Sequence, residues 1–181
     1  MTLAMKNSVQ VLFEASVGAG TPIISPLTRD LVANNITSIR AIVNGTTNYI
    51  LTRMANEAAS FEETLGQARQ LGYAESDPTN DVEGIDAAYK LAILSTLSFR
   101  SKVKYAQIYT EGITRLAPAD FIYAKELGYT IKLLAIATKE NHTVQARVHP
   151  TMMPKDEMMA KVDGVLNAVE IKTDLAQQVI F

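Results

Sequence analysis

Alternation of apolar and polar residues predicts β-strands near the beginning of the chain and again in its last third. Such a period of two is typical of strands that bury one face. The predicted strands are Val9–Phe13, Ile36–Val43, Tyr129–Thr138, Thr143–His149, Val165–Ile171 and Gln177–Phe181. The polar residues Lys139–His142 predict a hairpin between the two strands that they join, and the last two strands could pair in the same way.

Apolar residues at helical spacing fill most of the sequence between these strands. The predicted helices run from about Ser25 to Asn34, Asn48 to Glu57, Ser60 to Leu71, Val82 to Phe99 and Pro118 to Leu127. Ser60 and Glu63 have the spacing of a capping box, which marks the beginning of the third helix. The fourth helix is apolar nearly all round from Ala87 to Leu97, so we expect protein to cover both of its faces.

The order of these elements favours an α+β fold. Strands gather around a few helices without strict βαβ alternation, which is typical of a two-layer sandwich. We expect a mixed, mostly antiparallel sheet with helices packed on one face. No internal repeat or linker interrupts the sequence, so residues 1–181 are interpreted as one domain. The last strand reaches the end of the sequence without a polar terminator, and we expect the sequence to be part of a longer protein.

Composition and charge exclude several functional classes. The chain has 17 Lys and Arg against 19 Asp and Glu, a net charge of −2, so it lacks the basic surplus of a nucleic-acid-binding protein. It contains no cysteine, which excludes disulfides and thiolate metal sites. No apolar run approaches the roughly 20 residues that span a bilayer, and no secretory signal is recognisable. We therefore expect no membrane partner and a cytoplasmic location.

Asp86 and Lys90 lie four residues apart in the predicted apolar helix, which places them side by side on its surface. The simplest interpretation is a salt bridge within the helix, which contributes about 0.3–0.5 kcal/mol when it is exposed. Burial favours a second interpretation. A partly desolvated lysine beside a carboxylate can donate a proton and take it back near neutral pH.

Acidic residues crowd the loop before this helix, namely Glu75, Asp77 and Asp81. Solvation and the favourable interaction of negative charge with a helix N-terminus would explain them. They could instead form a negatively charged pocket for the ammonium group of a substrate.

Gly18 and Gly20 lie in a turn that resembles part of a dinucleotide fingerprint. The third glycine of that fingerprint is missing, because Ile23 stands at its position, so we predict no phosphate loop here. Tight packing would explain the two glycines. Alternatively, the turn could expose carbonyl groups that ligate a hard monovalent cation together with the Glu14 carboxylate.

Five segments resemble the homoserine dehydrogenase family in their order and spacing. They are Glu14–Ile24, Asn44–Leu51, Leu71–Pro78, Asp81–Leu91 and Leu127–Leu134. The similarity covers about Val11 to Val169 and corresponds to the catalytic and dimerisation region of that family. It implies NAD(P)-dependent interconversion of L-homoserine and L-aspartate 4-semialdehyde, on the path to threonine and methionine.

The resemblance also implies roles for individual residues. Lys90 matches the lysine that donates and accepts the proton, and Asp86 matches its partner. The residues that match the substrate site are Glu75, Asp81, Gly72, Tyr73 and Thr46. Those that match the cofactor site are Asn44, Gly45, Thr46 and Thr47. A sodium ion bound by some members of the family matches Glu14, Val17, Ala19 and Thr21.

Two parts of the family are expected to lie outside these 181 residues. They are the nucleotide-binding Rossmann half, which precedes this region, and the glycine-rich segment that follows the last strands and closes over the cofactor. We therefore expect the fragment to be inactive alone and to form a homodimer through its β-rich last third. The alternative is a non-catalytic module, derived from such an enzyme, that dimerises or senses an amino acid.

Overall fold

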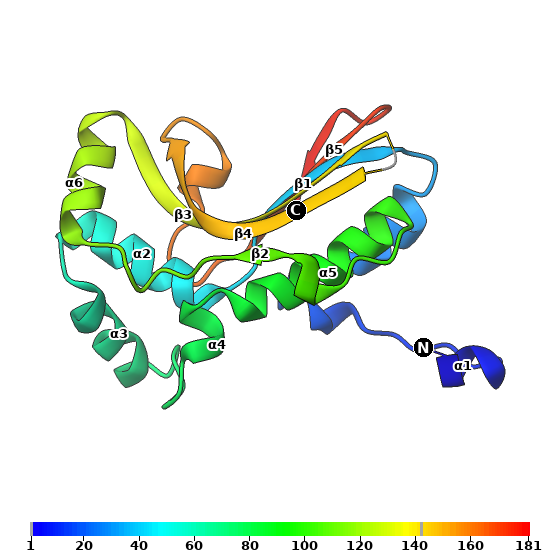
Figure 1. Ribbon diagram of the computed structural model, residues 1–181, viewed down its shortest axis with the longest axis horizontal. Helices are drawn as coiled ribbons and strands as arrows, with labels where there is room; N and C mark the ends of the chain where they lie inside the picture. Colours follow the sequence, from blue (N-terminus) through cyan, green and yellow to red (C-terminus); the bar gives the residue numbers. More distant parts are fainter. Residues whose placement is uncertain (1, 142) are drawn as a thin grey trace.

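Six strands form one sheet, and most of the helices pack against one of its faces (Figure 1). The computed structural model describes residues 2–141 and 143–181. The strands are β1 (Ile36–Ile42), β2 (Tyr109–Thr110), β3 (Tyr129–Glu140), β4 (Thr143–Pro154), β5 (Ala168–Thr173) and β6 (Gln178–Ile180). Their spatial order is β2-β4-β3-β1-β5-β6, and only β2 and β4 are parallel neighbours. The predicted α+β sandwich with a mixed, mostly antiparallel sheet is confirmed.

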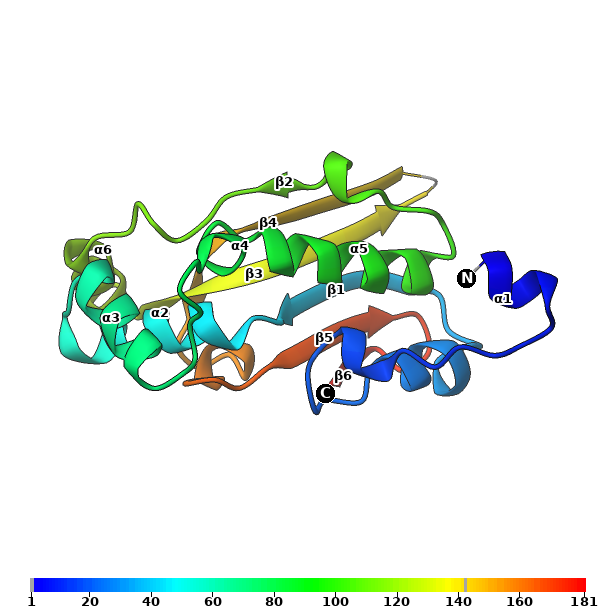
Figure 2. The same ribbon diagram turned by 90° about the horizontal axis from the view of Figure 1, so that it is seen from below.

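Most of the helices lie below the sheet in the view of Figure 1, and α6 (Pro118–Glu126) lies at its left end. Seen from below, α5 (Ile85–Phe99) runs along β1 and β3 (Figure 2). The α-helices are α1 (Thr2–Lys6), α2 (Gly45–Glu57), α3 (Phe61–Gln70), α4 (Thr79–Val82), α5 (Ile85–Phe99) and α6 (Pro118–Glu126). The shorter helical segments are η1 (Glu14–Ser16), η2 (Pro26–Asp30), η3 (Tyr105–Gln107) and η4 (Met159–Lys161). Among the residues described, no helix is both long and apolar enough to cross a membrane.

The main core lies between the sheet and the helices. Successive residues of a strand point to opposite faces, so Leu133 and Ala135 of β3 face α2 and α5. There they pack with buried residues such as Ile50 and Leu91. The other face has a smaller apolar cluster around Leu134. In this arrangement the N-terminal ends of α2 and α5 lie at the same end of β1 (Figure 2).

Several local predictions are confirmed. Ser60 caps α3 with the expected box, since its hydroxyl accepts a hydrogen bond from the Glu63 amide and the Glu63 carboxylate accepts one from the Ser60 amide. β3 and β4 form the predicted hairpin, with Glu140 opposite Thr143. Its turn includes His142, which lies outside the described residues. The last two strands pair in antiparallel fashion, as expected.

Three predictions are wrong. Val9–Phe13 is not a strand and has an irregular, largely exposed backbone, because alternation gives no strand without a neighbour to complete the hydrogen-bond ladder. The helix expected from Val82 is divided by Gly84, whose φ of +76° lies in the left-handed region. Protein also fails to cover all of α5, since Tyr89 is 51% exposed and stacks only on Tyr105.

Candidate active site

An open cavity of about 420 Å³ lies where the N-terminal ends of α2 and α5 meet the end of β1. Three predicted segments contribute to its wall: Asn44–Thr46, the pair Gly72 and Tyr73, and the acid-rich stretch that contains Asp81 and Lys90. The fold therefore brings together predicted residues that lie far apart in the sequence, such as Asn44 and Lys90, which are 46 positions apart.

Lys90 lies in this wall beside Asp86, one helical turn earlier on α5. Its Nζ is 2.6 Å from Asp86 Oδ2 and donates a hydrogen bond of 2.9 Å to the carbonyl of Val43. The two side chains are 23% and 30% exposed, so the amine is neither sealed in the core nor surrounded by bulk water. An ammonium group has three N–H donors, and the described residues offer acceptors for two of them. One donor is left for a ligand in the cavity.

Asn44 joins the acids of the site. It is the N-cap of α2, and its Oδ1 accepts hydrogen bonds from the amide and hydroxyl of Thr47. Its Nδ2 donates to Asp81 Oδ1 at 2.7 Å and to Asp86 Oδ2 at 2.9 Å. One buried amide thus fixes the start of a helix and two carboxylates at once. Since Asp86 also holds Lys90, Asn44 indirectly determines where the amine lies.

The remaining residues predicted for substrate and cofactor lie at different depths. Thr46 donates a hydrogen bond of 2.6 Å to the carbonyl of Tyr73, which ties α2 to the loop after α3. Thr47 is almost completely buried behind Asn44 and does not line the cavity. Glu75 is exposed on the loop and does not line it either. The geometry therefore groups Asn44, Gly45, Thr46, Gly72, Tyr73, Asp81, Asp86 and Lys90, and leaves Thr47 and Glu75 outside the wall.

The predicted cation ligands surround the turn at Gly18, where φ is +79° and a Cβ would lie 3.4 Å from Thr21. Ala19 follows at φ +51° and reaches the edge of the same cavity. The Glu14 carboxylate accepts backbone N–H bonds of 2.6–2.8 Å from Ile23, Ile24 and Ser25. Burial opposes its ionisation, but these three donors hold the pKa of Glu14 below its usual range. Nothing lies within 4 Å of a Cβ at Gly20, so tight packing explains only the first glycine.

Sequence reasoning missed three groups of this site: the Val43 carbonyl, Val165 and Asn167. Asn167 Oδ1 is shielded from solvent and has no hydrogen-bond partner among the described residues. Val165 and Asn167 come from the segment before β5, more than 70 residues after Lys90. The only available signal was an asparagine immediately before an apolar strand, which by itself indicates a turn as readily as a ligand contact.

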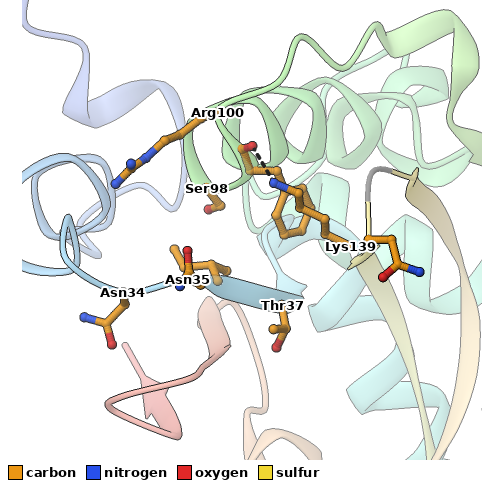
Figure 3. A pocket seen from close by; sticks show the side chains of 9 residues that line it. Asn34, Asn35, Thr37, Ser98, Arg100 and Lys139 are labelled. Carbon is orange, nitrogen blue, oxygen red and sulfur yellow. Dashed lines mark hydrogen bonds between the residues drawn. The ribbon is translucent and has the colours of Figure 1, made fainter.

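A second cavity, of about 310 Å³, lies at the opposite end of α5 (Figure 3). Lys139 and Arg100 both line it; the Lys139 side chain reaches toward the end of α5, and the Arg100 side chain extends away from the Lys139 amine. Lys139 donates to the carbonyl of Phe99, and Arg100 donates to the carbonyl of Val32. Its described lining residues include no carboxylate, so this cavity lacks the lysine–carboxylate pair of the first one.

A lysine–carboxylate pair in an open polar cavity of a two-layer α+β domain is typical of enzymes that exchange a proton with a small polar ligand. Comparison with known proteins identifies which enzymes. The sequence model of the family described as homoserine dehydrogenase matches residues 22–181. The chain therefore belongs to the homoserine dehydrogenase family.

Individual relatives agree with this assignment. The chain is 45% identical to a homoserine dehydrogenase of Neisseria gonorrhoeae over 179 residues and 50% identical to that of Synechocystis over 182 residues. These matches cover 99% and 98% of this chain, but 41% and 42% of the relatives. The chain thus spans about two-fifths of the length of the curated relatives it matches.

Solved structures show the same fold. A homoserine dehydrogenase from Thiobacillus denitrificans superposes with a TM-score of 0.96 at 46% identity, over 99% of this chain and 42% of that one. A hyperthermophilic archaeal homoserine dehydrogenase mutant in complex with NADPH gives a TM-score of 0.82 at 33% identity, over 99% of this chain and 51% of that one.

Proposed function

We propose that this chain is the catalytic region of an enzyme that interconverts L-homoserine and L-aspartate 4-semialdehyde in threonine and methionine biosynthesis. The observation that carries the proposal is the Lys90 amine, which faces an open polar cavity with one N–H donor unused. Family membership over residues 22–181 supports the reaction class. The pair Asp86 and Lys90 is then more than a salt bridge within a helix.

Lys90 would serve as the proton donor and acceptor. When the aldehyde is reduced, negative charge develops on its oxygen, and an ammonium group beside that oxygen both stabilises the charge and supplies the proton. In the oxidation of homoserine, the neutral amine would take the hydroxyl proton. Asp86 and the Val43 carbonyl hold two of the N–H donors, so they fix the third in one direction. Such fixed orientation favours proton transfer along a single path.

Asp81 is the acid that we assign to the ammonium group of the substrate. It lines the cavity, and its Oδ1 accepts only the Asn44 amide among the described residues, so the carboxylate keeps acceptor capacity for a cation. Gly72 and Tyr73 would form the adjoining wall, and Thr46 would fix Tyr73 through its carbonyl. Glu75 remains a predicted substrate ligand, and its contact would require the exposed loop to approach the cavity.

A nicotinamide cofactor, NAD or NADP, would supply the group that takes up or gives the hydride. The wall suits a polar ring, since the shielded Asn167 Oδ1 has no hydrogen-bond partner among the described residues and would accept a hydrogen bond from an N–H group of the cofactor. Asn44, Gly45 and Thr46 would face that ring, while Thr47 would act by holding Asn44. The archaeal relative in complex with NADPH supports this choice of cofactor. We propose that the nucleotide-binding half belongs to the rest of the full-length protein.

A sodium ion fits the turn around Ala19 in part. Glu14 Oε2 accepts a single N–H bond and keeps capacity for a cation, and the carbonyl groups of Val17, Ala19 and Thr21 would complete the ligand set. Oxygen ligands of this kind suit a hard cation. The ion would then anchor the turn that carries Ala19 to the rim of the cavity.

Two further properties belong to the proposal. Four methionines, at positions 152, 153, 158 and 159, lie close together in the last third of the chain. Met153 and Met159 fill the core, whereas Met152 and Met158 are exposed. Exposed methionines are common in subunit contacts, and we propose a homodimer formed through the β-rich last third of the chain, which carries both exposed residues. A biosynthetic enzyme of this class would act in the cytoplasm.

The test uses the full-length protein with L-homoserine and NAD or NADP, with reduction of the cofactor as the signal. Lys90→Met should lower turnover by about a hundredfold or more in a folded protein, whereas the control Lys139→Met should not, because Lys139 lies at the other cavity. Wild-type turnover in a folded Lys90→Met variant would remove the role of that lysine. A full-length wild-type protein with no turnover would contradict the activity itself and favour a non-catalytic dimerisation or amino-acid-sensing module.

A further inference from the structure

Residues 162–167, here called the strap, connect η4 with β5 and contribute to the wall of the cavity that Lys90 also lines. Val165 and Asn167 of the strap line the cavity. The strap lies close to the beginning of α2, since a Cβ at Gly45 would lie 3.0 Å from the Val165 carbonyl oxygen. A shift of the strap by a few tenths of an ångström would therefore change the space in which substrate and cofactor meet.

Lys132 of β3 donates hydrogen bonds to this strap. Its side chain is 1% exposed, and its Nζ donates hydrogen bonds of 2.7 Å to the Val162 carbonyl and 2.7 Å to Asp163 Oδ1. A third bond of 3.3 Å goes to Asn48 Oδ1 on α2. All three N–H donors are thus used within the protein, and the ammonium joins the strap, β3 and α2 at one point.

α2 supplies a second set of contacts. Asn48 Nδ2 donates to the carbonyl of Val162 at 2.9 Å and to that of Leu166 at 3.1 Å. The amide of Gly164 donates to Thr52 Oγ1 at 3.1 Å. Both ends and the middle of the strap are therefore fixed to the same helix whose N-cap forms the floor of the site.

Stability alone does not explain a lysine at position 132, because burial of its charge costs free energy of desolvation. Lys132 shares a strand face with Leu134 and Ile136, where an apolar side chain would pack without desolvating a charge. An apolar residue could not bond the Val162 carbonyl and the Asp163 carboxylate, and so could not fix the orientation of the strap. Fixed orientation of a loop is what a hydrogen-bonded buried cation supplies and packing alone does not.

We propose that Lys132 is a positioning residue of the active site, which acts through the strap rather than by contact with substrate or cofactor. This inference rests on the proposed function for its kinetic consequence, because the strap lines the same cavity as Lys90. Loss of the Lys132 ammonium would loosen residues 162–167, so substrate and cofactor would be held less often in the reactive arrangement. Proton exchange at Lys90 would not change, because Lys132 has no hydrogen bond to Lys90 or Asp86.

The experiment compares Lys132→Met with Thr52→Val in the full-length protein. Met keeps the length of the lysine stem, and Val keeps the shape of Thr while it removes the acceptor of the Gly164 amide. Amide hydrogen exchange of residues 162–167 should become at least tenfold faster in Lys132→Met, and exchange at Gly164 should become about threefold faster in Thr52→Val. For both variants the KM for homoserine should rise by more than kcat falls, and the pH profile of kcat should keep its shape.

The control is Glu170→Gln, which alters another buried charge of the sheet that bonds Arg40 and Gln178 and has no hydrogen bond to the strap. It should leave exchange in residues 162–167 and the KM unchanged. Unchanged strap exchange in folded Lys132→Met overturns the proposal, and if that variant fails to fold, unchanged exchange at Gly164 in Thr52→Val does so. A wild-type protein without homoserine turnover would defeat the proposed function, whereas the exchange data would still decide whether Lys132 holds the strap.

Discussion

Two lysine side chains lie near the beginning of α2, and their surroundings differ: one retains a free N–H donor and the other does not. Lys90 is partly exposed, has a carboxylate one turn earlier and retains an unused donor that faces a cavity. Lys132 is completely buried, and acceptors within the protein satisfy all of its donors. Charge and residue type are the same in both. The difference lies in whether the surrounding residues leave the amine an N–H donor for a ligand.

The contrast shows how to separate reactive from positioning lysines in a structure. A buried ammonium with every donor paired is held in one orientation, so it is suited to fix neighbouring chain segments. A lysine with a free donor at a cavity can meet a ligand and exchange a proton with it. Four predictions test this distinction, ordered from the largest expected effect to the smallest.

Lys90→Met should lower kcat by about 10²–10⁴-fold, because the proton would lose its positioned donor and acceptor. The unfolding free energy should change by no more than about 1 kcal/mol, because the ion pair is still partly exposed to solvent. Steady-state kinetics and urea unfolding of the same preparation measure the two effects. A large loss of stability with modest loss of turnover would place Lys90 in the same class as Lys132.

Lys132→Met should lower the unfolding free energy by about 1–3 kcal/mol, since the carbonyl of Val162 and the Oδ1 of Asn48 lose a buried donor. Urea unfolding monitored by circular dichroism measures this change. The matched change Lys139→Met removes a part-buried lysine that donates to a single carbonyl, that of Phe99, and should cost less. Equal losses in the two variants would argue against a special role for the fully paired cluster.

Asn44→Ala should destabilise the protein by about 1 kcal/mol, the usual cost of a lost N-cap, and should also reduce kcat/KM because Asp81 and Asp86 lose their shared donor. The control is Ser60→Ala, which removes the cap of α3 away from the cavity. It should cost similar stability and leave kcat/KM unchanged. Asn44 thus both stabilises a helix and positions the acids of the cavity, and the two variants separate the effect on stability from the effect on kcat/KM.

Glu14 adds a pH-dependent contact to the comparison. Its pKa is lowered in the folded protein, although burial opposes this, by N–H bonds from Ile23, Ile24 and Ser25. The stabilisation is therefore complete above the unfolded pKa and is lost as the pH falls through the lower folded value. Glu14→Gln should reduce stability at neutral pH and flatten the decline towards about pH 3. Urea unfolding across this range is the measurement, and parallel curves for both proteins would contradict the assignment.

Local sequence signals identified much of the fold. The spacing of Ser60 and Glu63, the turn chemistry at Asn44 and Gly45, and the alternation along β3 and β4 each depend on residues within a few positions. The same holds for Asp86 and Lys90, since a helix makes residues four apart into neighbours. Val9–Phe13 failed because its alternation carries no information about whether a partner strand lies beside it.

The rest of the site depends on contacts between distant segments. Asn44 reaches Asp81 and Asp86 across 37 and 42 residues, and no local pattern announces that link. Asn167 meets the cavity only because β5 pairs with β1 and brings the strap to Val43. A lysine between Ile131 and Leu133 was a signal for a buried polar contact, but its acceptors lie about 30 residues later in the chain.

The place of β1 in the sheet has a consequence for synthesis of the protein. β1 lies near the centre, yet Ser38 pairs with Thr138, and Ile42 pairs with Ala168. A ribosome needs on the order of 5–20 seconds to add the intervening hundred or so residues. During that time the apolar sides of α2 and α5 have no sheet to cover them. The nascent chain is therefore expected to depend on chaperones until its last third emerges, and truncations that remove β3 should aggregate during translation.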